Sequence, residues 1–537
     1  MAIEQWLAAS QALPGAPGAR VAHVSLDDWR NAAVEFAAAG GRLAALWASA
    51  HEHAGRSIHA AFWVERAAMV LTSQWADPEA AYPGIEDLFP AAARMQRAAA
   101  DLSGVHSTAT DTRPWVRHAA WPQTYRPLLD PPPGAVATGP AMERGAMERG
   151  VLEPGGMEVA PLEAGPAGSY DFVRVAGDGV HEIAVGPVHA GTIEPGHFRF
   201  SVVGEKVLRL EERLGYVHKG IERRFMELPI LEGQRLASRV SGDSAVAFSW
   251  AYCQALEGIA AIEIPARAAW LRALYLEMER IANHLGDLGA LGNDAGFAFG
   301  LAQFSRLKER LLRASEAALG ARYLLDAIVP GGTRLDLTGS AARELSHCVR
   351  EIAKEAVTLR EIYDEHEGLR DRFNGAGRVS TQLAQRLGLT GLAGRASGQA
   401  FDLRTDLPCD PYAQIAPSKM GHGEGDVAAR VAIRFDELQE SCRLINEIVA
   451  AVPAGAHSSR VGAPAAGALG LGFIEGWRGP VLVALEAGPG GSIRRCHPHD
   501  PSWQNWPVLE HAIIDNIVPD FPLINKSFNL SYSGHDL

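Results

Sequence analysis

The chain of 537 residues contains little cysteine, and its cysteines are widely separated. Its five cysteines are Cys253, Cys348, Cys409, Cys442 and Cys496, so the two nearest are 33 positions apart and no CxxC pair exists. Disulfide frameworks, zinc fingers and local iron–sulfur motifs need closely spaced cysteines. This spacing therefore disfavours all three.

Long apolar runs and excess positive charge are also lacking. No continuous apolar stretch approaches the roughly 20 residues that span a bilayer, and the opening sequence MAIEQWLAAS has no basic region before a long apolar core. The 50 Lys and Arg against 63 Asp and Glu give a net charge of -13, which repels nucleic acid. We expect a cytoplasmic protein with no nucleic-acid partner and no direct membrane span. It can still be peripheral to the cytoplasmic membrane through a partner.

Composition divides the chain into a first block (residues 1–129), a linker (130–169) and a second block (170–537). Hydrophobic residues make up 47% and charged residues 21% of the chain, which is typical of globular proteins. The first block predicts a helix over 26–50, strands within 58–72 and a helix over 91–101. Residues 130–169 contain PPPG and a tandem AMERG repeat, which bury too little apolar surface to order themselves. We read them as a linker, or else as a loop draped over a partner.

The second block alternates strand-like and helical patterns. Alternating apolar residues around VVGEK predict a hairpin within 197–215. Pro265 starts a helix in which apolar residues recur at helical spacing up to Leu288. Further helices are expected over 305–325, 342–366 and 428–452, and strands at GPVLVALEAG and SIRRC. The predicted class is α+β: a small mixed α/β N-terminal module, then a large, mainly α-helical bundle domain flanked by small antiparallel sheets.

Motifs throughout the second block resemble one known family. In order and spacing they are similar to the large subunit of group 4 nickel–iron hydrogenases, as in hydrogenase-4 and formate hydrogenlyase, and to its relative, the 49 kDa quinone-site subunit of respiratory complex I. The first block resembles the 30 kDa subunit of complex I through residues 93–129, although Ala-rich sequence replaces that family's acidic cluster. The second-block motifs are GPVHAGTIEPGHFRF (186–200), LGYVHKGIERRF (214–225), ASRVSGDSAVAFS (237–249), GLTGLAGRASGQAFDLRTDLPCDPY (388–412), GDVAARVAIRFDELQES (425–441) and the tail from Arg494.

The resemblance implies four cysteine ligands for a nickel–iron centre, in an early R-x-C-G-x-C and a late D-P-C-x-x-C. The early segment here is RVSGDS, with Ser241 and Ser244 at the ligand positions, and the late segment has Ser531 and Gly534. A nickel–iron centre needs soft thiolates, and hydroxyls are poor substitutes. Phe248 also stands where the hydrogenase pattern has a histidine. We therefore expect no nickel–iron centre and no other cofactor on this chain.

The complex I relative implies a quinone site. There a tyrosine and a loop histidine hold the quinone headgroup; Gly242 replaces the tyrosine and His189 matches the histidine. A quinone carbonyl could still meet His189, His197 or Arg239. Glu194 lies between the two histidines, and this triad predicts either proton transfer or a solvated loop tip. The candidate site residues are His189, Glu194, His197, Arg239 and Asp243, and the resemblance places Ser241, Ser244, Ser531, Tyr532 and His535 around the same cavity.

Two further clusters have both a functional and a structural interpretation. Residues Glu277, Arg280, His284 and Asp287 share one helical face, as a proton path or, more commonly, as structural ion pairs. The segment CHPHD (496–500) offers metal-ligand types but no second half-site, which favours a strand-to-helix connection. The sequence GPGGS (488–492) fits a hairpin turn and matches no dinucleotide fingerprint. Any NAD chemistry therefore belongs to another subunit.

The resemblance implies a function within a larger assembly. We expect the large subunit of the soluble arm of a membrane-associated oxidoreductase complex related to hydrogenase-4 and complex I. Such a subunit takes part in electron transfer coupled to ion or proton translocation. Its expected partners are a small subunit with an iron–sulfur cluster and antiporter-like membrane subunits. The alternatives are a non-catalytic scaffold subunit and a quinone-reducing subunit.

Overall fold

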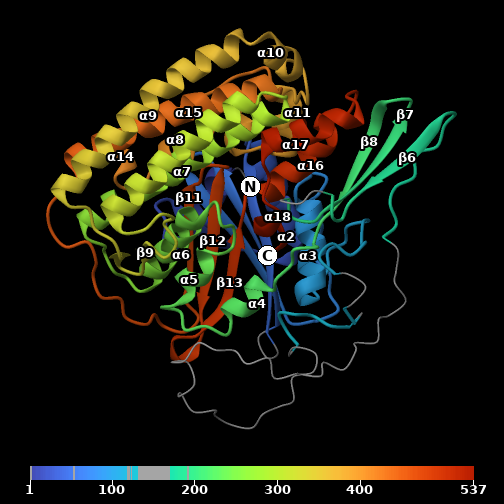
Figure 1. The fold of residues 1–537 in the computed structure, drawn as a ribbon. Coiled ribbons are helices and arrows are strands. Elements are labelled where there is room, and N and C mark those ends of the chain that lie inside the picture. The colour runs from blue at the N-terminus through green and yellow to red at the C-terminus, as the bar shows by residue number, and fades with distance from the viewer. Residues whose placement is uncertain (1–2, 52–54, 118–120, 123, 131–169, 190–192) are drawn as a thin grey trace, which may run out of the picture.

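A computed structural model describes residues 3–51, 55–117, 121–122, 124–130, 170–189 and 193–537 (Figure 1). The predicted linker lies outside the described residues, apart from Asp130. The α+β class is confirmed, because many helices accompany one mixed sheet and three smaller antiparallel sheets. In the part of the chain that the structure describes, no helix is long and apolar enough to cross a membrane.

The N-terminal part is built on a mixed sheet with the strand order β1-β2-β5-β4-β3. Only β2 and β5 pair in parallel, and the other neighbours are antiparallel. The helices α2 and α3 contact β5 and β3, and their apolar side chains join those of the sheet in one core. The elements are α1 (Ile3–Ala9), β1 (Gln11–Ala12), β2 (Ala19–His23), α2 (Leu26–Ala38), β3 (Arg42–His51), β4 (Gly55–Val64), β5 (Ala67–Trp75) and α3 (Ala92–Ser103).

The helix predicted over residues 26–50 is wrong in its second half. The helix α2 ends at Ala38, Gly40 adopts the left-handed region at φ +74°, and β3 follows. Residues 43–49 are buried, since this strand packs against α3 on one side and against β12 and β13 on the other. An Ala-rich strand buried on both faces loses the alternation that distinguishes it from a helix.

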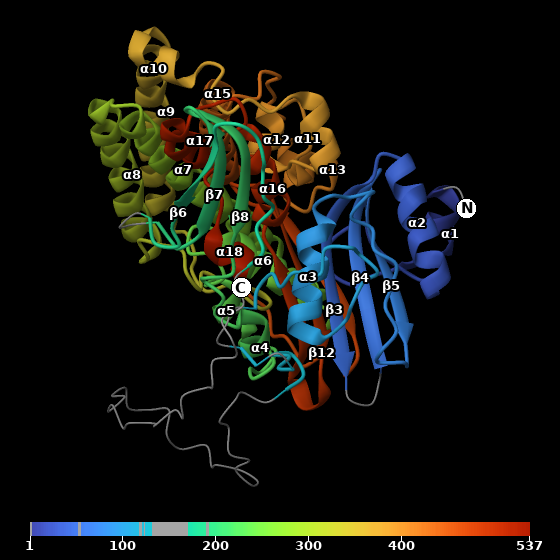
Figure 2. The ribbon, with the colours of Figure 1, turned by 90° about the vertical axis from the view of Figure 1, so that its right-hand side faces the viewer.

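A second sheet forms the centre of the molecule (Figure 2). Its antiparallel strands are β11 (Leu469–Glu475), β12 (Pro480–Ala487) and β13 (Ile493–His499), and a short 3-10 turn (Pro489–Gly491) joins the last two, as GPGGS predicts. One face contacts the N-terminal sheet, where Trp47 and Trp63 share a core with Phe473 and Leu482. The other face contacts α6. The approach is close, because a Cβ at Gly472 would lie 1.8 Å from the carbonyl oxygen of Ala251.

The third layer is helical, and its four long predicted helices are present with shifted ends (Figure 1). The central helix α7 begins directly after Pro265, as predicted, and packs against α8 and α15. The predicted hairpin is also present as β7 and β8. The elements of this region are β6 (Val180–Val185), β7 (His197–Val203), β8 (Lys206–Arg213), α4 (Ile221–Phe225), α5 (Gly233–Ala237), α6 (Ala245–Ile259), α7 (Ala266–Asp294), α8 (Ala298–Leu319), β9 (Ile328–Val329), β10 (Gly332–Thr333), α9 (Gly339–Glu365), α10 (Glu367–Phe373), α11 (Thr381–Leu387), α12 (Gly391–Ala396), α13 (Leu403–Asp406), α14 (Tyr412–Ile415), α15 (Val427–Ala451), α16 (Ser502–Ala512), α17 (Phe521–Phe528) and α18 (Tyr532–Asp536).

A buried arginine joins the N-terminal part to the rest of the chain. Arg94 on α3 is 7% exposed and pairs with Glu212 on β8 at 3.1 Å and with Glu510 on α16 at 2.7 Å. Burial raises the pKa of Glu212 well above its usual value, which Arg94 partly offsets. Without Arg94 this carboxyl would be buried with no cation beside it.

We predict that Arg94→Met lowers the free energy of unfolding by about 3 to 5 kcal/mol, because it removes one partner of a buried ion pair and leaves the carboxyl group of Glu212 without it. Thermal unfolding followed by circular dichroism measures the loss. The matched control is Arg30→Met, because Arg30 and Asp87 form an exposed pair whose removal costs about 0 to 1 kcal/mol. Equal shifts for both variants would contradict the prediction.

Candidate functional site

The early and late motif segments meet in a cluster of hydroxyl groups. The Oγ atoms of Ser241 and Ser531 are 2.9 Å apart, and Ser241 also donates to Asp243 Oδ1 at 2.7 Å. The backbone N–H of Gly534 donates to Ser531 Oγ at 2.8 Å, because this serine caps the helix α18. Since Ser241 donates its proton to Asp243, the hydrogen bond between the two serines must be donated by Ser531. The donors therefore run in one direction, from Gly534 to the carboxylate of Asp243.

That carboxylate is bound by a buried arginine. Arg478 Nη2 lies 2.6 Å from Asp243 Oδ2, and its Nε donates to the carbonyl of Asn529 at 2.6 Å. Ser244 Oγ also reaches Asp243 Oδ1, at 3.3 Å. Burial alone would raise the pKa of Asp243, but Arg478 and the serine hydroxyls lower it below the usual range. Asp243 is therefore an ionised acceptor at neutral pH.

The space next to Gly534 is filled by Asp500. A Cβ added at Gly534 would lie 2.6 Å from Asp500 Oδ2 and 2.8 Å from its Cγ. Asp500 follows β13; its Oδ1 accepts from the N–H of Ser502 at 2.8 Å, and its buried Oδ2 has no hydrogen-bond partner. Burial raises the pKa of Asp500, and Arg478, at 4.0 Å, partly offsets this.

These residues do not fit a nickel–iron centre. Three of the four ligand positions implied by the resemblance carry hydroxyl groups, which hydrogen-bond to one another and to Asp243. The fourth, Gly534, has no side chain, and its Cβ position is blocked by Asp500. Hard oxygen donors that already have partners cannot replace four soft thiolates.

The predicted His189–Glu194–His197 group is not drawn together by any contact among the described residues. The Nδ1 atoms of His189 and His197 lie near the carbonyls of Pro187 and Gly186, at 3.2 and 3.3 Å. Glu194 instead accepts from the N–H of Ser533 at 3.0 Å. The two histidines therefore hold the turn, and Glu194 fastens the loop to the C-terminal segment.

Arg239 takes part in a separate ion pair. Its guanidinium binds Asp326 through two hydrogen bonds of 2.6 and 2.8 Å, and its side chain is 48% exposed.

Of the residues predicted around one cavity, only Asp243 borders the cavity of about 190 Å³ beside this cluster. Its wall also contains Gly242, Glu279, Lys308, Arg322 and several apolar side chains. Tyr532 packs on Trp506, and His535 stacks on Trp503 at 4.0 Å.

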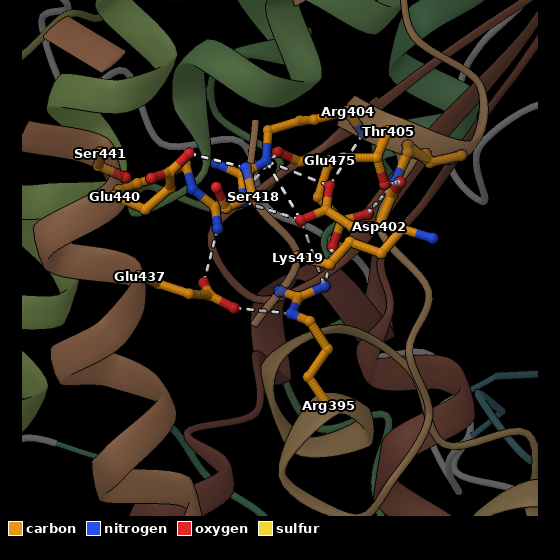
Figure 3. Close-up of polar contacts among 12 residues, drawn as sticks. Arg395, Asp402, Arg404, Thr405, Ser418, Lys419, Glu437, Glu440, Ser441 and Glu475 are labelled. Carbon is orange, nitrogen blue, oxygen red and sulfur yellow. Dashed lines mark hydrogen bonds and ion pairs between the residues drawn. The ribbon is translucent and has the colours of Figure 1, made fainter. Parts of the chain in front are cut away.

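Glu277, Arg280 and His284 belong to a buried ion-pair network, and Asp287 pairs with Arg434 at 2.8 Å. Figure 3 shows the part of this network around Arg395, Glu437 and Glu475. Glu437 on α15 binds Arg280 at 2.6 Å and Arg395 at 2.7 Å. Arg395 also binds Glu475 at 2.7 Å. Each of these four side chains is 1% exposed or less. Glu277 in turn is held by Arg404, Tyr412 and Ser441.

The segment CHPHD is a strand followed by a helix start, in agreement with its structural interpretation. His497 lies on β13 with its Nδ1 2.7 Å from Glu222, and His499 Nε2 lies 3.1 Å from Gln504. Burial lowers the pKa of both histidines. Among the described residues no group of three or more His, Cys, Asp or Glu side chains is arranged to hold a metal ion.

Two residues of the cluster were not singled out as site residues from the sequence. Arg478 stands alone in GWRGP, where no spacing marks it, and only the turn between β11 and β12 aims it at Asp243. Asp500 appeared only as one letter of CHPHD. No sequence pattern marks either residue. The partner of Arg478, Asp243, is 235 positions away, and Asp500 acts by filling the space beside Gly534, which has no side chain.

Comparison with known proteins identifies a set of relatives. Residues 294–467 match the family described as respiratory-chain NADH dehydrogenase, 49 Kd subunit. The chain is 31% identical over 373 residues to formate hydrogenlyase subunit 5 of Escherichia coli, which covers 69% of this chain and 65% of the relative. It is 30% identical over 369 residues to hydrogenase-4 component G of E. coli, covering 68% and 64%. The chain thus spans just under two thirds of the length of both relatives.

Two further comparisons cover other branches. The C/D subunit of the NADH-quinone oxidoreductase of Bacteroides thetaiotaomicron is 27% identical over 289 residues, covering 54% of this chain and 54% of the relative. Among solved structures, a chain of the membrane-bound sulfane sulfur reductase, an archaeal respiratory membrane complex, has a TM-score of 0.63 at 24% identity. That match covers 67% of this chain and 98% of the other, and it shows a shared fold.

The contact between Gly534 and Asp500 predicts the effect of restoring a side chain. Gly534→Cys should lower the free energy of unfolding by about 1 to 3 kcal/mol, because overpacking displaces neighbours. Adding Asp500→Ser should recover most of the loss, since serine is shorter and can still cap Ser502. Thermal unfolding of the two single variants and the double variant measures the coupling. A stable Gly534→Cys single variant, or additive losses in the double variant, would contradict the contact.

Proposed function

Since this chain belongs to the family of the 49 kDa subunit of respiratory-chain NADH dehydrogenase, with hydrogenase-4 and formate hydrogenlyase subunits among its relatives, we propose that it is the large peripheral subunit of a membrane-associated oxidoreductase complex. In this proposal it has no nickel–iron centre of its own. It takes part in electron transfer coupled to ion or proton translocation. Its partners are an iron–sulfur small subunit and antiporter-like membrane subunits at the cytoplasmic face.

The observation that carries the proposal is the directed hydrogen-bond chain at the former ligand positions. The N–H of Gly534, the hydroxyls of Ser531 and Ser241 and the carboxylate of Asp243 are all satisfied by one another, and Arg478 neutralises the end. These hydrogen bonds hold the ionised carboxylate of Asp243 in one orientation at the edge of the cavity of about 190 Å³, as a fixed acceptor for a proton that a donor in the cavity delivers. The chemistry left to this subunit is therefore proton positioning beside a partner's redox centre.

Quinone reduction is a second candidate, favoured by the cavity of about 190 Å³ beside Gly242 and Asp243. The complex I relative places its quinone-binding tyrosine at the position of Gly242, and here no side chain fills that space. Met278, Leu311 and Leu324 give the cavity apolar walls. An apolar wall with a few polar groups, among them the carboxyl groups of Asp243 and Glu279, suits a small ring that carries polar groups.

We expect the purified complex to contain less than about 0.1 nickel per copy of this chain, since hydroxyls do not replace the thiolates. Elemental analysis by mass spectrometry measures nickel, and a cysteine-bearing relative prepared in parallel serves as the control. Stoichiometric nickel in this chain would overturn the proposal.

Asp243→Asn tests whether the cluster works or is only structural. Loss of the carboxylate leaves Arg478 without its nearer ion-pair partner, and we expect the oxidoreductase activity of the assembled complex to fall about tenfold, or about 1.4 kcal/mol. Activity should be measured with a quinone and with a soluble acceptor, because a loss confined to quinone favours the second candidate. The control is Asp326→Asn at the exposed pair with Arg239. Unchanged activity in an intact Asp243→Asn complex would leave only the scaffold role.

A further inference from the structure

A cleft of about 1380 Å³ lies between the N-terminal part and the β6–β8 sheet, away from the serine cluster. One wall is formed by α3 and the loops that follow it, and the other by residues 170–182 and strands of the sheet. Both elements lie on the same side of the molecule in Figure 1. The lining holds seven arginines and four carboxylates, although the whole chain carries a net charge of -13. The arginines are Arg97, Arg113, Arg117, Arg126, Arg174, Arg199 and Arg213.

Carboxylates bind only some of these arginines. Asp111 binds Arg97 at 3.2 Å and Arg113 at 2.7 Å, and Arg113 also binds Glu211. Glu182 binds Arg199 at 2.9 Å. Arg174, by contrast, is exposed at the rim and has no ion pair with any described residue. Asp101 also lies 3.7 Å from Arg117. Among the described residues the seven arginines of the cleft still outnumber the carboxylates that pair with them.

Arg213 is the deepest of the cations and has no carboxylate partner among the described residues. It is 3% exposed, its Nη2 donates to the carbonyl of Arg117 at 2.8 Å, and its Nη1 has no hydrogen-bond partner. Its guanidinium lies 4.9 Å from the ring centre of Tyr170. Burial lowers the pKa of Arg213, and the neighbouring Arg97 adds to that effect. A buried cation with an unused donor is costly unless a ligand supplies the acceptor.

A second residue that lines this cleft has an unpartnered polar atom. His197 lines it and its buried Nε2 atom has no partner. Burial also lowers the pKa of His197, and Arg199 contributes to the shift. The rings of Trp121, Tyr170, Phe172 and Tyr216 complete the lining. Aromatic rings and arginines are the side chains most enriched where polypeptides bind one another.

We propose that this cleft is the docking site for an acidic segment of a partner polypeptide, whose carboxylates pair with Arg213 and Arg174. A polypeptide suits it better than a small anion, because the volume exceeds the roughly 300 to 1,000 Å³ of typical small-ligand pockets. Charge complementarity favours acidic side chains at this cleft, because its arginines attract them while the rest of the negatively charged chain repels them. This inference goes beyond the proposed function and does not depend on the chemistry of the serine cluster.

Binding of fluorescein-labelled octaglutamate to the full chain, followed by fluorescence anisotropy at 50 mM salt, tests the proposal. We expect saturable binding that weakens about tenfold in the double variant Arg174→Glu/Arg213→Gln, because one buried and one exposed cation are lost. The matched control is Arg343→Glu on α9, which makes the same charge change as Arg174→Glu at an exposed position outside the cleft and should change the affinity less than twofold. Binding should also weaken as salt rises to 200 mM.

Three outcomes would overturn the proposal. One is the absence of saturable octaglutamate binding, and another is equal weakening by Arg343→Glu, which would indicate general surface attraction. The third is binding of inorganic pyrophosphate to the cleft with no binding of the peptide, which would assign it to small phosphate anions. If Arg213→Gln fails to fold by circular dichroism, Arg174→Glu alone keeps the test decisive. Its exposed side chain makes no ion pair with a described residue, and it should still weaken binding about threefold.

Discussion

The buried ion-pair network around Glu437 is the constraint on which the positions of the other elements depend. Moving an arginine or a carboxylate out of water costs several kcal/mol, which only close and complete pairing offsets. Arg280 on α7, Arg395 on α12, Glu437 on α15 and Glu475 on β11 must therefore meet at one point. Their meeting fixes the helical layer against the central sheet.

This network also places the residues of the candidate site. Arg280 Nη1 donates to the carbonyl of Gly476 at 2.7 Å and so holds the turn after β11. Arg478 follows two residues later and points at Asp243. The orientation of the ionised carboxylate is thus determined by a network that shares no atom with it. A change in the network would move this turn, and with it the arginine that orients Asp243.

The sequence predicted helices and strands better than it predicted contacts between residues far apart in the chain. Pro265 and the apolar spacing after it marked α7, and the VVGEK turn marked the β7–β8 hairpin, because both signals are local. The Ala-rich stretch after Gly41 was assigned to the wrong element, since only tertiary packing makes it a strand buried on both faces. The serine cluster was found through the resemblance. Arg478 and Asp500 were not, because their roles exist only once distant segments have come together. The domain boundaries, the partners and the roles of His189, His197 and Arg239 stay predictions.

The packing of Asp500 against Gly534 has an evolutionary consequence. A cysteine at position 534 fits only beside a shorter residue at position 500, so the cysteine substitution alone strains the fold. Two matching substitutions arise together only rarely, so the packing of Asp500 against Gly534 opposes the change. While Asp500 keeps its place, a thiolate cannot be introduced at position 534 by a single substitution without displacing that carboxyl group.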